Sequence, residues 1–133
     1  MMNKLLGGLT MAALLSAGTT PALADQFLVI ASQGPSFASP AEALTVLEKT
    51  IVPTFDALLK LQADRKIVAG GLPVGDRAFA FILEAASNAE ADEILRNIPA
   101  WPMLDWEVTP LQSFKARADK ERSVVAELKK QQH

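Results

Sequence analysis

Two short segments of this chain are apolar on both of the faces that a β-strand presents. They are Gln26–Ser32 (QFLVIAS) and Arg77–Ala85 (RAFAFILEA). A strand with one wet face alternates apolar and polar residues, but in these segments both alternating sets are largely hydrophobic. One face carries Phe27, Val29, Ala31, Phe79, Phe81 and Leu83, and the other carries Leu28, Ile30, Ala78, Ala80 and Ile82. Both segments are therefore predicted to be central strands of a sheet that is covered on both sides.

The order of the remaining elements predicts the topology of that sheet. A helix over 41–62 begins at the capping sequence Ser39-Pro40-Ala41-Glu42, and Pro53 is expected to kink it or to divide it near Val52. The other predicted elements are strands over 66–72 and 103–111, a turn over 73–76, and a second helix over 87–98. The resulting order is strand, helix, strand, strand, helix, strand. It predicts an α+β, ferredoxin-like βαββαβ fold with a four-stranded antiparallel sheet.

Two helices can cover only one face of such a sheet. Leaving Leu28, Ile30 and Ile82 in water on the other face would cost roughly 1.5 to 3 kcal/mol for each side chain. A second copy of the chain, packed sheet to sheet as a two-fold homodimer, would cover this face. The alternative is a monomer whose own C-terminal segment covers it.

The N-terminus has the pattern of an export signal. A short basic start (1–4) precedes an apolar run over 5–17 and the small-x-small site Ala22-Leu23-Ala24. The apolar run is shorter than the roughly 20 residues of a membrane-spanning helix, so a cleaved signal peptide (1–24) is preferred to an uncleaved anchor. We therefore expect a periplasmic or secreted protein that is not attached to a membrane. The chain has no cysteine, so its core must hold the fold without disulfides.

Charge divides the exported part into an acidic body and a basic tail. Residues 25–112 hold six basic and twelve acidic side chains, whereas 113–133 hold six basic and three acidic ones. This balance gives no reason to expect a nucleic-acid partner. The tail is predicted to be an amphipathic helix that docks on its own domain or on a partner subunit, with a membrane surface as the alternative. Its apolar stripe consists of Leu111, Phe114, Ala118, Val125 and Leu128.

The segment NIPAWPMLDWEVTPL (97–111) resembles the C-terminal signature of the muconolactone isomerase family, a proline turn leading into an acidic, alternating strand. The segments RKIVAGGLP (65–73) and DRAFAFILEA (76–85) are similar to the central hairpin of that family. The resemblance implies a ferredoxin-like fold that assembles into dimeric α+β barrels. It also implies a reaction in which a proton moves between carbons of a small unsaturated lactone that bears a carboxylate.

Such a proton transfer needs a base, and a carboxylate substrate needs a cation. The one histidine, His133, is the terminal residue, so the candidate bases are carboxylates. Glu84 is predicted to be the proton carrier because it is the acidic residue on an otherwise apolar strand face, where burial would raise its pKa. Arg77 is its predicted catalytic partner, and Lys66 is a second candidate cation for the substrate.

Four further residues are candidates for substrate contact, each with a structural alternative. Asp105 and Glu107 lie on one side of the last strand, where they could equally form its wet face. Trp101 and Trp106 could stack on an unsaturated ring, although tryptophans at such positions more often belong to a core or an interface. No metal site or cofactor is expected, because the chain lacks cysteine and has only a terminal histidine.

Two functional classes remain open. One is a cofactor-independent isomerase acting on a small unsaturated lactone or enone-like molecule. The other is a non-catalytic exported module for ligand binding or oligomerisation. A pocket that joins Glu84 to Arg77 or Lys66 would favour the enzyme, and a pocket filled by aromatic side chains would favour the module.

Overall fold

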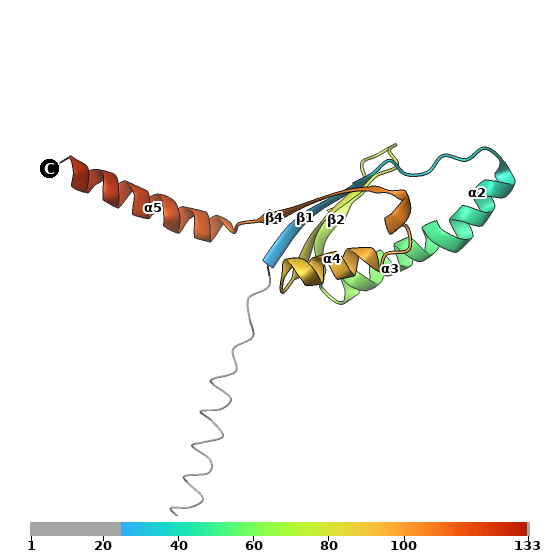
Figure 1. The fold of residues 1–133 in the computed structure, drawn as a ribbon, viewed down its shortest axis with the longest axis horizontal. Coiled ribbons are helices and arrows are strands. Elements are labelled where there is room, and N and C mark those ends of the chain that lie inside the picture. The colour runs from blue at the N-terminus through green and yellow to red at the C-terminus, as the bar shows by residue number, and fades with distance from the viewer. Residues whose placement is uncertain (1–24, 133) are drawn as a thin grey trace, which may run out of the picture.

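The computed structural model describes residues 25–132, so the predicted signal peptide (1–24) lies outside the described part of the chain. The described part folds as an α+β unit with a C-terminal helix (Figure 1). Its elements are β1 (Asp25–Ser32), α2 (Pro40–Val46), the π-helical turn η1 (Leu47–Ile51), α3 (Val52–Ala63), β2 (Ile67–Gly71), β3 (Phe79–Ala85), α4 (Asn88–Arg96), the 3-10 turn η2 (Trp101–Met103), β4 (Asp105–Leu111) and α5 (Phe114–Gln131).

The four strands form one antiparallel sheet in the order β2-β3-β1-β4. The two strands with apolar residues on both faces, β1 and β3, are the central pair, with Phe27 opposite Leu83 and Val29 opposite Phe81. The predicted α+β, ferredoxin-like arrangement is confirmed. The third strand begins at Phe79 instead of Arg77, and ahead of it the Arg77 carbonyl accepts a hydrogen bond from Gly34 N–H (2.9 Å) beyond the end of β1.

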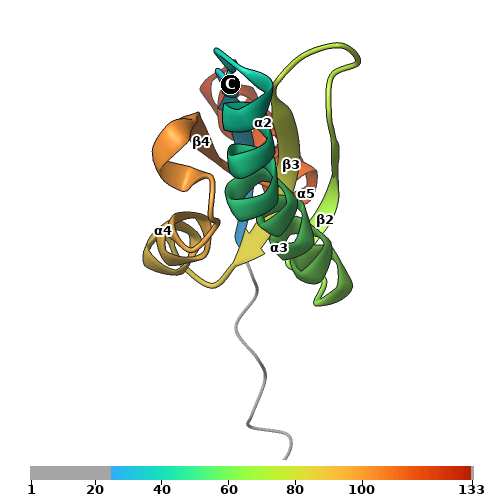
Figure 2. The same ribbon diagram turned by 90° about the vertical axis from the view of Figure 1, so that its right-hand side faces the viewer.

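The core lies between the sheet and the helices α3 and α4, which cover the same sheet face (Figure 2). Leu83 and Val29 are fully buried at its centre, and α4 adds Ala91 and Leu95. Ser87 caps α4 as predicted, since its Oγ accepts from Glu90 N–H at 3.1 Å. The predicted second helix over 87–98 is thus confirmed, with Ala91 and Leu95 on its buried face.

Pro53 interrupts the regular hydrogen bonding of the helical stretch from Pro40 to Ala63. Ser39 Oγ accepts a hydrogen bond from Glu42 N–H (3.1 Å), which confirms the predicted cap. The Glu42 carboxylate in turn accepts from Ala38 N–H (2.9 Å), one residue before the cap. Just before the proline, Val52 N–H donates to the Leu47 carbonyl five residues back. The stretch is thus divided near Val52, as predicted, and a wider π turn separates α2 from α3 at the point where proline cannot continue regular helical bonding.

The opposite sheet face, which we call the outer face, is not covered by any helix of residues 25–132. Its central side chains are Leu28, Ile30, Ala80 and Ile82, and Ile30 is 36% exposed. An apolar sheet face of this kind is the surface that was predicted to need a cover.

The C-terminal helix α5 continues outward from the end of β4 and projects away from the sheet and the other helices (Figure 1). Its Ser113 cap accepts from Ala116 N–H at 3.0 Å. None of its side chains is buried, and Phe114 is 97% exposed. Within residues 25–132, no helix combines the length and the apolar character needed to cross a membrane.

Gly70 and Gly71 offer a matched test of packing at the sheet edge. A Cβ on Gly70 would lie 2.5 Å from Phe81 Cβ and 2.6 Å from the Ala80 carbonyl oxygen, whereas a Cβ on Gly71 would meet nothing within 4 Å. We expect Gly70→Ala to lower the free energy of unfolding by roughly 1 to 3 kcal/mol through overpacking, and Gly71→Ala to change it far less. Urea denaturation of both variants measures the difference, and equal effects would contradict the packing argument.

Candidate functional site

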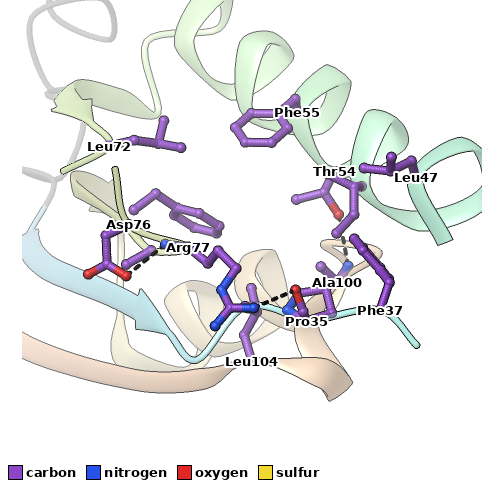
Figure 3. Close-up of a pocket in the computed structure, with 14 residues that line it drawn as sticks. Pro35, Phe37, Leu47, Thr54, Phe55, Leu72, Asp76, Arg77, Ala100 and Leu104 are labelled. Carbon is purple, nitrogen blue, oxygen red and sulfur yellow. Dashed lines mark hydrogen bonds between the residues drawn. The ribbon is translucent and has the colours of Figure 1, made fainter. Parts of the chain in front are cut away.

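An apolar cavity of about 250 Å³ lies between the helical stretch and one end of the sheet. Figure 3 shows side chains from four parts of the chain around it. The loop after β1 supplies Phe37, the helices supply Leu47, Thr54 and Phe55, the loop before β3 supplies Asp76 and Arg77, and the residues flanking η2 are Ala100 and Leu104. Most of the lining is hydrocarbon, so a molecule in this cavity would be held mainly by apolar contact with a few polar groups at its edge.

Arg77 is the cationic side chain of the cavity lining. Three hydrogen bonds hold its backbone and its guanidinium in place. Gly34 N–H donates to the Arg77 carbonyl (2.9 Å), Arg77 N–H donates to Asp76 Oδ1 (2.7 Å), and Arg77 Nη1 donates to the Pro35 carbonyl (3.3 Å). A Cβ on Gly34 would lie 2.7 Å from both Arg77 Cβ and the Arg77 carbonyl oxygen, so only glycine allows this approach. A guanidinium has five N–H donors, which leaves donors for a carboxylate or carbonyl oxygen in the cavity.

Thr54 provides a polar group deep in the lining. Its side chain is 2% exposed, and its Oγ1 accepts from Ala100 N–H at 2.9 Å. This bond ties α3 to the segment that leads into η2, so it fixes one wall of the cavity. Because a hydroxyl also carries a donor, Thr54 can serve an acceptor atom on a bound molecule.

Aromatic rings form the wall between the cavity and the core. Phe55 and Phe79 meet edge to face with centroids 6.5 Å apart, and Phe79 stacks beside Phe81 at 6.0 Å. Such pairs add to the free energy of burial and hold the rings in fixed orientations. The cavity therefore has a rigid apolar wall opposite its charged edge.

The structure does not bring Glu84 and Arg77 together. Glu84 lies on the outer face at the far end of β3, where its Oε1 accepts from Gln26 Nε2 (3.2 Å), and it does not line the cavity. Glu84 lies seven positions after Arg77, which in extended chain is a distance of about 23 Å. The sequence-based pairing of Glu84 with Arg77 at one small substrate is therefore not formed within a subunit.

Lys66 is engaged elsewhere. Its Nζ donates to Glu90 Oε1 at 2.9 Å, an ion pair that joins the start of β2 to the first turn of α4. The hydrogen bond from Lys66, together with one from Ala86 N–H, lowers the pKa of Glu90 below its ordinary value. Lys66 lies beside Glu84, whose N–H donates to the Lys66 carbonyl (2.7 Å), but its ammonium is paired with Glu90 and neither Lys66 nor Glu84 lines the cavity.

Asp105 and Glu107 lie on the outer face of the edge strand β4, opposite Ser32 and Ile30 of β1. Both side chains are exposed. Their shared side of the strand is as predicted, and neither lines the cavity.

The two tryptophans pack within the subunit. Trp106 Nε1 donates to the Trp101 carbonyl (2.9 Å), and the Trp106 ring meets Phe79 edge to face at 5.7 Å. The Arg96 guanidinium lies 4.6 Å from the centre of the Trp101 ring. These contacts explain both residues as part of the core border, which was the structural alternative.

Sequence reasoning missed Thr54, Asp76 and the aromatic wall of the cavity. Asp76 was assigned to a turn, and Thr54 is one polar residue within an apolar helical pattern. A buried threonine on the core face of a helix was the available signal, since a polar group there needs a partner. Its partner, Ala100 N–H, is 46 residues away in sequence, so the pattern of the helix could not reveal it.

The sheet, its helical cover and the cavity define a small α+β protein of ferredoxin-like architecture with an apolar cavity between helix and sheet. Among families, the profile described as Muconolactone delta-isomerase matches residues 40–117, more than half of the 133 residues. The chain therefore belongs to the muconolactone delta-isomerase family. No curated protein matches the chain.

The Lys66–Glu90 pair predicts a dependence of stability on pH. Because the pKa of Glu90 is lowered in the folded state, the unfolded chain binds its proton first as the pH falls below about 4.5. The pair therefore stabilises the fold above that pH, and the contribution is lost as the pH falls through the folded-state pKa. Glu90→Gln is expected to flatten this loss in urea midpoints measured from pH 6 to pH 3.

Glu93→Gln is the control, because Glu93 is exposed on the same helix and forms no ion pair within the described residues. It should retain the wild-type pH dependence. Identical profiles for the Glu90 variant and the wild type would exclude this role of the ion pair.

Proposed function

We propose that this protein binds a small, mostly apolar molecule carrying one carboxylate or carbonyl oxygen, and that Arg77 anchors that oxygen. The observation that carries the proposal is the apolar cavity with Arg77 and Asp76 at its edge. Its volume of about 250 Å³ lies just below the usual range for drug-sized ligands, which favours a molecule of one small ring. The rigid aromatic wall suits an unsaturated ring, as in a lactone or an enone.

Family membership favours a second step, isomerisation of the bound molecule by proton transfer. A base would take a proton from a carbon next to the carbonyl and return it to another carbon, so that no cofactor is consumed. Asp76 is the carboxylate in the lining of this cavity, and we propose it as the proton carrier for a ligand held there. Glu84 can take that role only for a ligand on the outer face.

Replacement of Arg77 tests the binding proposal. With benzoate and the neutral benzamide as probes, Arg77→Met should weaken benzoate binding by about tenfold or more, because a hydrogen bond to a charged group contributes about 1.5 to 3 kcal/mol. Benzamide binding should change little. Lys60→Met, at an exposed position on α3, is the control and should leave both probes unaffected. Chemical-shift titrations measure the binding of both probes to the wild type, the Arg77 variant and the Lys60 variant.

If the control weakened benzoate binding as much as the Arg77 variant, Arg77 would not be the anchor.

For any unsaturated lactone or enone that is turned over, Asp76→Asn should lower kcat and Glu84→Gln should not. The reverse result would move the chemistry to the outer face. Binding without turnover of such compounds would favour the non-catalytic module.

We also propose that two copies of the chain associate through the outer face. The apolar side chains of β1 and β3 on that face support this, and the family is known for dimeric α+β barrels. A charge placed among these side chains should cost little in a single subunit, where Ile30 is already partly exposed, but much in a buried interface.

Ile30→Asp should therefore convert the dimer to a folded monomer at micromolar concentration, as seen by sedimentation velocity and circular dichroism. Ala89→Asp, on the exposed first turn of α4, is the control and should stay dimeric. A wild-type protein that sediments as a monomer would refute the association.

Export is part of the proposal and is supported by the N-terminal pattern. The basic start, the short apolar run and the Ala22-Leu23-Ala24 site all precede β1, which begins at Asp25. A mature chain that starts at Asp25 would leave the first strand complete. N-terminal sequencing of the exported product checks this, and an intact N-terminus retained in the cell would contradict it.

A further inference from the structure

Thr54 is a polar side chain that the fold itself uses only in part. It is the third residue of α3, is 2% exposed and lines the cavity beside Arg77. Its Oγ1 accepts a hydrogen bond from Ala100 N–H at 2.9 Å. A hydroxyl also has one hydrogen to donate, and this hydrogen has no acceptor among residues 25–132. The bond with Ala100 therefore accounts for the oxygen of Thr54 but not for its hydrogen.

Hydroxyl side chains elsewhere in the helices donate to the preceding turn. Thr45 Oγ1 donates to the Ala41 carbonyl and Ser123 Oγ to the Asp119 carbonyl, each four residues earlier and at 3.2 Å. This bond is the usual one for serine or threonine inside a helix. Thr54 makes no such bond within the described part of the chain, and its oxygen is bonded to a distant segment instead. Its O–H is therefore open to a molecule in the cavity.

The surroundings of Thr54 make an unmet donor costly. The cavity lining next to it along the helical stretch is hydrocarbon, supplied by Leu47, Ile51 and Phe55. A buried hydroxyl donor without a partner loses its hydrogen bond to water and gains no bond in exchange. An acceptor atom on a bound molecule restores that bond in a place where few other groups compete for it.

The polar side chains of the cavity come from two different walls. Asp76 and Arg77 both belong to the loop before β3, whereas Thr54 belongs to α3 (Figure 3). Among the 14 lining residues, these three are the ones whose side chains carry a charge or a hydrogen-bonding group. A small ring held between the two walls can thus meet Arg77 with one oxygen and Thr54 with another.

We propose that Thr54 is a specificity-determining donor of this cavity, whose O–H donates to a carbonyl oxygen on a ring that Arg77 holds by its carboxylate. This inference rests on the function proposed above and assigns the partner of the second oxygen. A ring acid with an additional carbonyl group can accept the Thr54 bond. A ring acid of the same size with hydrocarbon at that position leaves the hydroxyl unpaired, so the cavity discriminates between the two.

The same bond assists the proton transfer proposed for Asp76. When Asp76 takes a proton from the carbon next to the carbonyl, the electron pair of the broken C–H bond moves into the carbonyl group, whose oxygen becomes an enolate. The bond from the Thr54 O–H strengthens as this charge develops, which lowers the barrier. Asp76 then returns the proton to another carbon of the conjugated system. The carbonyl is restored and the double bond has moved, so atoms and charges balance.

Paired probes test the assignment by binding alone. The 3- and 4-acetylbenzoates carry the additional carbonyl oxygen, and the ethylbenzoates of the same substitution carry hydrocarbon of similar size. For at least one pair, Thr54→Val should shift the ratio of the two affinities by about three- to tenfold in favour of the ethyl compound. This is the size expected for one hydrogen bond between neutral groups. Chemical-shift titrations of the full-length protein measure the ratio.

Thr54→Ser is the matched control, because it keeps the hydroxyl and should retain the wild-type ratio. The valine variant also removes the acceptor of Ala100 N–H, so circular dichroism checks its fold and benzoate checks its cavity. A structural change that weakens every probe equally leaves the ratio unmoved. If the valine variant does not fold, the wild type decides: nuclear Overhauser effects between the Thr54 methyl and the acetyl group of the bound probe are expected, and their absence would overturn the proposal.

The outcomes separate this inference from the binding proposal. An unchanged ratio in a folded Thr54→Val protein, with benzoate still weakened by Arg77→Met, would overturn the role of Thr54 and leave the Arg77 anchor in place. A shifted ratio without an effect of Arg77→Met would remove the anchor and keep the Thr54 donor. For any compound that is turned over, Thr54→Val should lower kcat by about tenfold or more and Thr54→Ser should restore it. An unchanged kcat would overturn the assistance to proton transfer.

Discussion

The antiparallel pairing of β1 with β3 is the interaction on which the rest of this structure depends. It aligns Phe27 with Leu83 and Val29 with Phe81, and these four side chains form the floor against which α3 and α4 pack. Burial of such side chains supplies the main free energy of folding in a chain without disulfides. The same pairing places Leu28, Ile30 and Ile82 together on the outer face. One register thus decides both where the core lies and which apolar surface the helices leave uncovered.

The cavity arises where this pairing ends. Beyond β1 the chain turns away, and the bond from Gly34 N–H to the Arg77 carbonyl holds the loop before β3 against it. The helical stretch continues past the end of the sheet, so Leu47 and Phe55 extend over a space that no strand fills. The hydrogen bond between Thr54 and Ala100 closes the far wall. Backbone contacts between distant loops, more than any motif, therefore place Arg77 at the edge of an apolar space.

The sequence predicted the fold more completely than the site. Hydrophobic periodicity identified β1, β3 and α4, because a buried face repeats along a single element. Arg77 lies in the cavity lining, whereas Glu84, which was paired with it because both flank one strand, does not. Alternation along a strand places odd-numbered and even-numbered positions on opposite faces, so Arg77 and Glu84 do not share a face. The length of β3 also separates them. The tryptophans were candidates for ligand contact on their chemistry, with a place in the core as the alternative, and their contacts with one another and with Phe79 were not visible in the sequence.

What the sequence determined by itself was the order of elements, the central position of β1 and β3, the caps Ser39 and Ser87, and the separation of an acidic body from a basic tail. These features depend on residues close in the chain or on composition. Only the tertiary structure decided that Arg77 meets Thr54 and Phe55 across one cavity, and that Lys66 is bound to Glu90. The physical reason is that each of these depends on the distance between segments far apart in sequence, which is fixed when the sheet and the helices pack.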